Sequence, residues 1–395
     1  MKTWLKSFVK NNKFVYRIYY YAGSAILRFI GLFVKPDPNQ ILFTSYGGRK
    51  FDDSPRVVYE YLQEHPISEK HKFIWAFTQP EDFPDVVNSV RIDTIRYYLT
   101  ALRSGYWITN ASIARGLNFK PRNTKNILFV HGMTGIKRIA FDVLQKERAF
   151  VVAYHETFDH VFIEGKKEIP ILSKVWNLDT CVFHTTGLPR NDDLIDFSPA
   201  EVDAVKRKLG IPGGKQVILY APTFRDYDKA PDGSSALHLP MSFDKWKTML
   251  GEEYVLLITA HYEVAKFLDS LPHDDFVVNA FGYPYINDLI KVSDILVTDY
   301  SSIVFDYSIL ERPIFCYGYD YNTFRTVRGT YMDIEKLFCN GVIQDEDTLL
   351  KTIKNMDYAK QCNYTKNYIK DEFLASYGDA ARKAVNIIFE SEIGV

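Results

Sequence analysis

Residues 295–320, ILVTDYSSIVFDYSILERPIFCYGYD, predict two buried parallel strands joined by a helix. The first strand is the β-branched run ILVTDY, the helix follows the spacing of SSIVFDYSILE, and the second strand is PIFCYGY. The first amides of a helix lack intrahelical partners and carry the positive end of the helix dipole. Because the hydroxyls of Ser301 and Ser302 adjoin these amides, we expect the turn to bind an anion, and phosphate is the expected ligand.

Four further landmarks precede this stretch along the chain. They are His131-Gly132, GLPRND at 187–192, APTFRD at 221–226 and Ala260-His261. Together with TDYSS at 298–302, and with the Phe-Asp-Tyr, Arg-Pro and Arg-Gly that follow it, they resemble the signature of the CDP-glycerol glycerophosphotransferase family, the teichoic acid primases and polymerases. The resemblance spans residues 105 to 385 and implies a GT-B-like pair of Rossmann-type domains.

From Pro36 onward, strand-like and helix-like patterns alternate, which predicts parallel α/β sheets with ligands at the carboxyl ends of the strands. The expected strands are Ile41–Tyr46, Lys72–Phe77, Tyr106–Asn110, Asn126–His131, His160–Ile163, Cys181–Thr185, Val217–Ala221, Tyr254–Ala260, Phe276–Asn279, Ile295–Asp299 and Pro313–Tyr317. The length of 395 residues makes two domains the default. We therefore expect two Rossmann-like domains facing a cleft, residues 37–198 on the acceptor side and residues 199–395 binding the CDP donor. The resemblance also suggests that a last helix near 379–390 crosses back to the first domain.

The N-terminal segment 1–36 differs from the rest of the chain in charge. It contains seven Lys or Arg and no acid, so it carries +7, and the net charge of −1 leaves −8 elsewhere. Aromatic and aliphatic side chains alternate with these bases, which is typical of an amphipathic helix lying on an anionic membrane surface. A signal peptide or a spanning helix fits poorly, because Arg28 interrupts the apolar part and 19–34 is shorter than the ~20 residues needed. N-terminal helices packed into the core are the alternative.

His131 is the expected general base. It ends the apolar run NILFV and precedes Gly132, so its imidazole should lie at the carboxyl end of a strand. A hydroxyl that attacks phosphorus needs its proton accepted, and imidazole titrates near working pH. The residues alone favour a structural histidine, whereas the resemblance favours the base. The family usually continues His-Gly-Thr-Pro-x-Lys and this chain reads HGMTGIKR, so Thr134 and Lys137 are candidate matches in a segment one residue longer.

The resemblance implies that the donor diphosphate binds to the second domain. His261 closes the predicted strand YVLLITA and is expected to act catalytically on the donor, with packing or helix capping as the alternative. Arg328, next to Gly329, could bind phosphate oxygens bidentately, unless it is an ordinary surface arginine. The other donor-binding assignments are Thr223, Arg225, Thr298, Asp299, Ser301, Ser302 and Gly329, and the further candidates are Gly132, Arg190, Asn191 and Asp192.

A polar stretch at 227–239 follows the APTFRD landmark and is either a mobile flap or an ordinary surface loop. Asp226-Tyr227-Asp228 matches the Asp-x-Asp metal signature of other glycosyltransferases, but a three-residue match among 49 acids is weak. We therefore expect no metal and no other cofactor. The chain lacks the P-loop, the Rossmann glycine fingerprint after a first strand, and G-x-S-x-G, which removes support for ATP hydrolysis, dinucleotide redox chemistry and hydrolase chemistry. Nucleic-acid binding also lacks support, because the basic segment is aromatic-rich and the remainder is acidic.

By resemblance, the chain is expected to be a peripheral phosphotransferase on the cytoplasmic face of the cell membrane. It would move glycerol phosphate, or ribitol phosphate, from a CDP-activated donor to a lipid-linked glycan or polyol-phosphate acceptor and release CMP. A teichoic acid primase or short-chain enzyme is favoured over a long-chain polymerase, and capsule synthesis uses the same chemistry. A GT-B glycosyltransferase with a nucleotide-sugar donor and a non-catalytic membrane assembly factor are the alternatives. Measuring which nucleotide raises the melting temperature would distinguish a glycosyltransferase from a glycerophosphotransferase. The presence of His131, His261 and the Ser301-Ser302 pair argues against a non-catalytic assembly factor.

Overall fold

The computed structural model describes residues 12–139, 142, 156–223, 225, 240–259 and 274–393. The chain divides into two compact units, each with its own parallel sheet. Unit 1 consists of Met1–Met133, Ile139–Asp192 and Ala375–Val395, and unit 2 consists of Thr134–Arg138 and Asp193–Leu374. The chain therefore passes between the units four times.

The sheet of unit 1 has seven parallel strands in the order β3-β2-β1-β4-β5-β6-β7. In chain order the strands are β1 (Asp37–Thr44), β2 (Lys72–Phe77), β3 (Ser89–Arg91), β4 (Ser104–Thr109), β5 (Lys125–Phe129), β6 (His160–Phe162) and β7 (Phe183–His184). Register is set by pairs such as Ile41 with Tyr106 and Ile108 with Ile127. The strand order reverses between β1 and β4, and such switch points are where open α/β sheets bind ligands.

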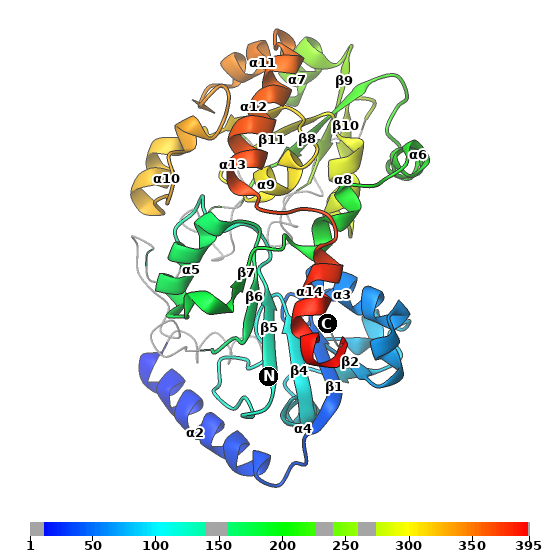
Figure 1. Ribbon diagram of the computed structural model, residues 1–395. Coiled ribbons are helices and arrows are strands. Elements are labelled where there is room, and N and C mark those ends of the chain that lie inside the picture. Colours follow the sequence, from blue (N-terminus) through cyan, green and yellow to red (C-terminus); the bar gives the residue numbers. More distant parts are fainter. Residues whose placement is uncertain are drawn as a thin grey trace. The chain divides into compact units, whose positions relative to one another are not determined.

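Helices cover both faces of this sheet. They are α2 (Lys13–Gly31), α3 (Asp53–Glu64), α4 (Ile95–Arg103), α5 (Ile169–Trp176), α14 (Ala380–Ile388) and α15 (Glu390–Ile393). On one face, Phe43 and Trp75 pack with Val58 of α3 and Val385 of α14, and these two helices lie side by side in Figure 1. Leu42 points to the opposite face and packs with residues of α2 and α4. The segment around 380–389 is thus part of the core of unit 1.

Helix α2, dark blue in Figure 1, buries one side and exposes the other. Tyr16 and Leu27 are buried, and Ser24 accepts a hydrogen bond of 2.8 Å from the amide of Asn118. The opposite side exposes Phe14, Ile18, Tyr21, Ile26, Phe29, Leu32 and Phe33. Across the described residues, the helices are too short or too polar to cross a bilayer. The helix is therefore packed on unit 1 and still presents an apolar surface, so it combines features of both sequence-based alternatives.

The sheet of unit 2 has six parallel strands in the order β10-β9-β8-β11-β12-β13. In chain order they are β8 (Gln216–Ala221), β9 (Tyr254–Ile258), β10 (Val277–Asn279), β11 (Ile295–Thr298), β12 (Ile314–Tyr317) and β13 (Val342–Ile343). Leu296 pairs with Leu219 on one side and with Ile314 on the other. Here the switch point lies between β8 and β11, the second of which begins the stretch 295–320.

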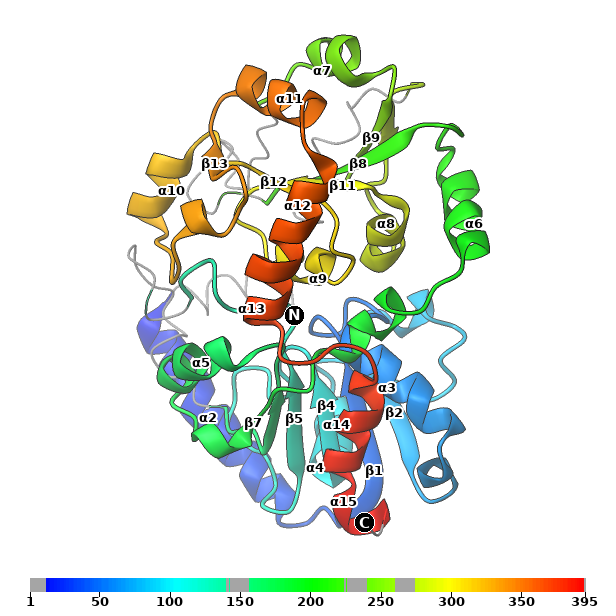
Figure 2. The same cartoon turned by 45° about the horizontal axis from the view of Figure 1, so that its top comes forward.

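The helices of unit 2 also follow the alternation seen in the sequence. They are α6 (Pro199–Leu209), α7 (Phe243–Leu250), α8 (Ile286–Val292), α9 (Ile303–Ser308), α10 (Tyr321–Val327), α11 (Glu346–Lys354), α12 (Tyr358–Tyr364) and α13 (Asp371–Phe373). Trp246 of α7 and Leu350 of α11 pack in one core with Ile218 and Val297 of the sheet. A π-helical segment, Thr365–Lys370, joins α12 to α13 in one helical run (Figure 2).

The prediction of two parallel α/β sheets is confirmed, and each expected strand overlaps an observed one. The short edge strands β3 and β13 were not expected. The second unit resumes at Asp193, close to the predicted boundary at Pro199. The units differ from the predicted ranges 37–198 and 199–395 in two segments. Thr134–Arg138 belongs to unit 2, and Ala375–Val395 belongs to unit 1.

Candidate functional site

Three polar residues follow the carboxyl ends of adjacent strands at the switch point of unit 1. Tyr46 comes after β1, Asn110 after β4 and His131 after β5, and these strands are neighbours in the sheet. The carboxyl ends of parallel strands meet at one edge, so the three residues are brought together. The Tyr46 and His131 rings meet edge to face with centroids 6.2 Å apart. Sequence reasoning found His131 and missed the other two.

His131 is exposed, and a hydrogen bond to the backbone orients its ring. Nδ1 lies 3.2 Å from the backbone carbonyl oxygen of Asn110. A carbonyl oxygen accepts and cannot donate, so Nδ1 carries the proton of the neutral ring. Nε2 is then left with a lone pair, which is the form that a general base requires. Gly132, with φ of +150°, provides a backbone conformation that other residues rarely adopt.

Arg190 approaches His131 from the 3₁₀ segment Pro189–Leu194. Its Nη1 donates to the carbonyl oxygen of His131 at 3.0 Å and lies 3.4 Å from a carboxylate oxygen of Asp53. The Asp53 carboxylate also accepts a 2.6 Å hydrogen bond from the Tyr46 hydroxyl. Burial, and after it the Asp53 charge, raise the pKa of Tyr46 well above its ordinary value. Arg190 is therefore the member of the GLPRND landmark that lies next to the histidine.

The two residues after Arg190 support the fold of unit 1. Asn191 is buried and donates from Nδ2 to Glu164 at 3.0 Å. Asp192 accepts from the amides of Ala380 and Ala381 at 2.8 and 2.9 Å, so its carboxylate caps the start of α14. These contacts give both residues a structural use, and a part for them in binding stays a prediction.

Thr134 and Lys137 lie only a few residues after His131 but belong to unit 2. Lys137 forms an antiparallel bridge with Thr330, and the amide of Arg138 donates to the carbonyl oxygen of Gly329 at 3.1 Å. Residues 134–138 thus form a short strap paired with the segment that follows Arg328. Arg328 is half-buried at the end of α10, and Gly329 has φ of +77°.

A second polar cluster lies at the switch point of unit 2. Arg225 is 3% exposed, and its guanidinium pairs with Asp299 at 2.7 Å and with Asp320 at 2.6 Å. Thr223 donates to Asp299 from both its amide and its hydroxyl. Burial alone would lower the pKa of Arg225, but Asp299 and Asp320 raise it above the ordinary value. Arg225 therefore lies beneath the surface between two carboxylates, those of Asp299 and Asp320.

This arrangement changes how the donor-binding assignments in unit 2 are interpreted. Arg225, Asp299 and Thr223 bind one another, and Thr298 is fully buried with its hydroxyl on the carbonyl oxygen of Ala221 at 2.7 Å. Such side chains can hold the ends of β8 and β11 in place. Donor contact by these four residues stays a prediction.

Ser301 and Ser302 are half-buried at the start of α9, after the end of β11. The Ser301 hydroxyl lies 3.4 Å from the amide of Ile303. Ser302 is the N-cap residue of this six-residue helix, and its side chain makes no capping hydrogen bond to described residues. Phosphate binding here stays a prediction. His261, Phe224 and the stretch 226–239 lie outside the described residues.

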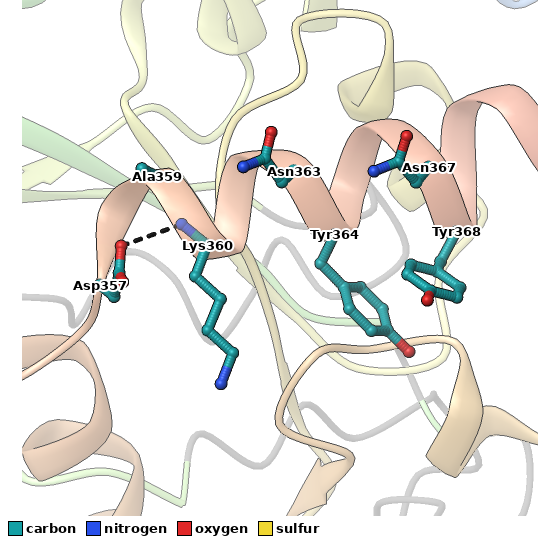
Figure 3. A pocket seen from close by; sticks show the side chains of 7 residues that line it. All are labelled: Asp357, Ala359, Lys360, Asn363, Tyr364, Asn367 and Tyr368. Atoms are coloured by element: carbon teal, nitrogen blue, oxygen red, sulfur yellow. Dashed lines mark hydrogen bonds between the residues drawn. The ribbon is translucent and has the colours of Figure 1, made fainter.

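Two other features of the described residues bear on ligand binding. Within them, no group of three or more His, Cys, Asp or Glu side chains could hold a metal ion. A surface hollow of about 390 Å³ follows one helical run of unit 2, where Lys360, Tyr364 and Tyr368 project from the same side (Figure 3). The two tyrosine rings stack at 4.5 Å. None of the predicted site residues lines this hollow, and we assign it no function.

Comparison with known proteins places this geometry in context. Residues 26–390 match the family described as CDP-Glycerol:Poly(glycerophosphate) glycerophosphotransferase. A teichoic acid poly(glycerol phosphate) polymerase from Staphylococcus epidermidis is 30% identical over 338 residues, which cover 82% of this chain and 46% of that polymerase. A teichoic acid glycerol-phosphate transferase from Staphylococcus aureus is also 30% identical, over 82% of this chain and 85% of the transferase.

The solved structure of the wall teichoic acid polymerase TagF superposes with a TM-score of 0.80 at 26% sequence identity. The match covers 93% of this chain and 92% of that one. This chain spans about half the length of the full polymerases to which it is first compared, 46% of the protein from S. epidermidis and 49% of that from Bacillus subtilis.

Proposed function

Because the chain belongs to the CDP-glycerol glycerophosphotransferase family, we propose that it transfers glycerol phosphate from CDP-glycerol to an acceptor hydroxyl in teichoic acid synthesis. The acceptor is a lipid-linked glycan or polyol phosphate. The acceptor oxygen forms a bond to the phosphorus of the glycerol phosphate, the bond from that phosphorus to CMP breaks, and CMP leaves.

The observation that carries this proposal is the fixed ring of His131. In the neutral ring, the hydrogen bond from Nδ1 to the carbonyl oxygen of Asn110 leaves the lone pair on Nε2 of an exposed imidazole. Nε2 takes the proton of the attacking hydroxyl as the new bond forms. General-base catalysis of this type typically contributes 10²–10⁴-fold to the rate.

The donor site is the part of unit 2 around the start of α9 and the end of α10. Ser301, Ser302 and Arg328 supply hydroxyl and cationic groups for the diphosphate, and His261 adds a further donor contact. The buried Arg225 cluster holds the ends of β8 and β11 beneath these groups. Charge that develops on CMP is stabilised by these donors.

The test uses the full chain with CDP-glycerol and a synthetic lipid-linked acceptor, with products weighed by mass spectrometry. We expect the acceptor to gain glycerol phosphate and CMP to appear in equal amount. CDP-ribitol and a nucleotide sugar serve as competing donors, and His131→Ala serves as the inactive control. Transfer from the nucleotide sugar without transfer from CDP-glycerol would reject this function in favour of a glycosyltransferase.

The chain also docks on the cytoplasmic face of the cell membrane through α2. The apolar side of this helix is unpartnered among the described residues, with Phe29 63% exposed, Leu32 79% and Phe33 76%. Arg17 and Arg28 on the same helix are exposed and can lie over anionic lipid. Each base near such a surface contributes about 1 kcal/mol, which salt screens, whereas the apolar contribution is salt-insensitive.

Point substitutions test this docking better than deletion, because the buried side of α2 belongs to the core of unit 1. Phe29→Ser with Phe33→Ser should sharply reduce sedimentation with anionic liposomes and leave transfer to a short soluble acceptor unchanged. Val87→Ser with Ile95→Ser is the matched control, since these side chains are equally exposed elsewhere in unit 1, at 90% and 81%. Equal loss of binding in both double variants would argue against docking through α2.

A further inference from the structure

A buried carboxylate is linked to His131 through a closed set of contacts. We propose that Asp53 is a positioning residue for His131, whose negative charge neutralises Arg190 and thereby allows the neighbouring imidazole to accept a proton. This inference rests on the proposed function, in which His131 is the base.

The contacts form a ring that begins and ends at His131. Its Nδ1 donates to the backbone oxygen of Asn110, and Oδ1 of Asn110 accepts from the amide of Tyr46 at 2.7 Å. The Tyr46 hydroxyl donates to Asp53 at 2.6 Å, and Arg190 bridges Asp53 to the carbonyl oxygen of His131. Each member is fixed by two neighbours, so a change at Asp53 reaches the histidine by two routes.

Asp53 is held in an unfavourable backbone conformation and in a buried place. Its φ is +64°, in the left-handed region that non-glycine residues rarely adopt, and Tyr46 has φ of +48°. Such strain persists where surrounding contacts determine the conformation, and it gathers at functional sites. The side chain of Asp53 is 1% exposed, and its carboxylate accepts from the amide of Ser54 at the start of α3. The helix dipole stabilises a negative charge at this position.

The chemical argument concerns the charge that appears on the ring during the reaction. When Nε2 takes a proton, an imidazolium forms on the residue whose backbone carbonyl oxygen the guanidinium of Arg190 binds, and the two positive charges repel. Asp53 offsets that repulsion because it pairs with Arg190 through the same Nη1 that donates to the carbonyl oxygen of His131. Two further charged residues lie near the Tyr46 ring and stay in all variants below. They are Lys50, whose ammonium lies 5.3 Å from the ring centre, and Asp52, the N-cap of α3.

The test measures protonation of His131 directly, without substrate. The full chain is labelled with ¹⁵N-histidine, the His131 signals are assigned by their loss in His131→Ala, and the ring is titrated. Asp53→Asn should lower the midpoint of this titration by roughly 0.5 to 1 pH unit, because it removes the negative charge that pairs with Arg190. Arg190→Gln should raise the midpoint by a similar amount. The double variant should return close to the parent. Tyr97→Phe is the matched control, because it removes a buried hydroxyl that donates to the carbonyl oxygen of Ile113 elsewhere in unit 1.

Turnover gives the second measurement. Asp53→Asn should lower kcat about tenfold, keep KM for CDP-glycerol, and move the acidic limb of the pH–rate profile to lower pH. Unchanged titration midpoints in folded Asp53→Asn and Arg190→Gln would overturn the inference and leave Asp53 a purely structural residue. Should Asp53→Asn fail to fold, an unchanged midpoint in Arg190→Gln decides against it. Full turnover of His131→Ala, by contrast, would overturn the proposed base and not the charge link.

Discussion

The two sheets carry polar clusters at corresponding places, the carboxyl ends of the strands that flank each switch point. The clusters differ in which side chains they expose to solvent. In unit 1 an exposed histidine stands on a ring of supporting contacts through Asn110, Tyr46 and Arg190. In unit 2 the ionised side chains, Arg225, Asp299 and Asp320, are turned inward onto one another. The first cluster presents an exposed imidazole, whereas the second buries its ionised side chains against one another. The polar clusters at the carboxyl edges of the two sheets are therefore not expected to have the same function.

The largest expected effect tests whether the cluster of unit 2 is structural. Arg225→Met leaves Asp299 and Asp320 buried without their cation, and breaking a buried pair in this way costs about 3–5 kcal/mol. The unfolding transition of unit 2, followed by calorimetry, should fall strongly. Arg325→Met, the same substitution at an exposed arginine of α10, should leave it nearly unchanged. Equal transitions in the two variants would show that the inward-facing charges do not stabilise unit 2.

The next prediction concerns pH, because unit 1 contains a desolvated carboxyl group, that of Glu156. Desolvation raises the pKa of Glu156 to about 7 from an ordinary value of 4.5, against the hydrogen bonds from Ser112 and Asn126. A raised carboxyl pKa means that stability is present at low pH and is lost as pH rises through about 7. Glu156→Gln should therefore gain stability over the parent between pH 4.5 and 7.5, by about 3 kcal/mol.

His160 acts in the opposite sense, since burial lowers its pKa to about 4 and stability falls as pH drops below about 6.5. The contribution of His160 is the same in Glu156→Gln and in the parent, so it cancels in the difference between their free energies of unfolding. Chemical denaturation at several pH values measures the difference. A gap that stays constant with pH would refute the assignment to Glu156.

A third prediction returns to the exposed histidine. His131→Ala should reduce turnover by at least ~10²-fold while CDP-glycerol affinity is largely kept, as expected for loss of a base. Steady-state kinetics and calorimetric binding separate the two quantities. His160→Ala offers a comparison with a histidine of the same sheet that does not lie at the switch point. Near-normal turnover of His131→Ala would show that His131 is not the general base.

The last prediction concerns the donor side. Ser302→Ala together with Arg328→Ala should weaken CDP-glycerol binding by a few kcal/mol, because hydrogen bonds to charged groups contribute about 1.5–3 kcal/mol each. Titration calorimetry measures the affinity, and Arg325→Ala is the cationic control on the same helix. An affinity equal to that of the parent would show that the phosphates do not bind at the start of α9 and the end of α10.

The fold was predictable because long β-branched runs alternate with helical spacing. Lys72–Phe77 was expected as a strand with the bounds that β2 has, whereas β3 and β13 are too short to show a period. The exchange of segments between units was not predictable for 134–138, since a five-residue strap carries no pattern of its own. The crossing of α14 was suggested by the resemblance.

The site was predictable in part. His131 and Arg190 were found through the family landmarks, but their contacts with Asp53 depend on tertiary structure. Nothing in the pair Asp52-Asp53 tells which carboxylate is buried. A usable signal did exist for the other members, because Tyr46 and Asn110 end predicted strands in the same way as His131, and the rule that ligands bind at carboxyl ends applies to all three.

The entry of α14 into the core of unit 1 also sets an order of events during synthesis. Ala384, Val385, Ile388 and Phe389 pack against Ile41, Phe43 and Val58, which are made more than three hundred residues earlier. Unit 2 draws on the chain up to Leu374. Multidomain chains usually fold domain by domain as they leave the ribosome, but here the strands of unit 1 are translated before unit 2 and α14, which completes their core, is translated after it. The emerging chain therefore exposes an unfinished apolar face of unit 1 until Phe389 has left the exit tunnel.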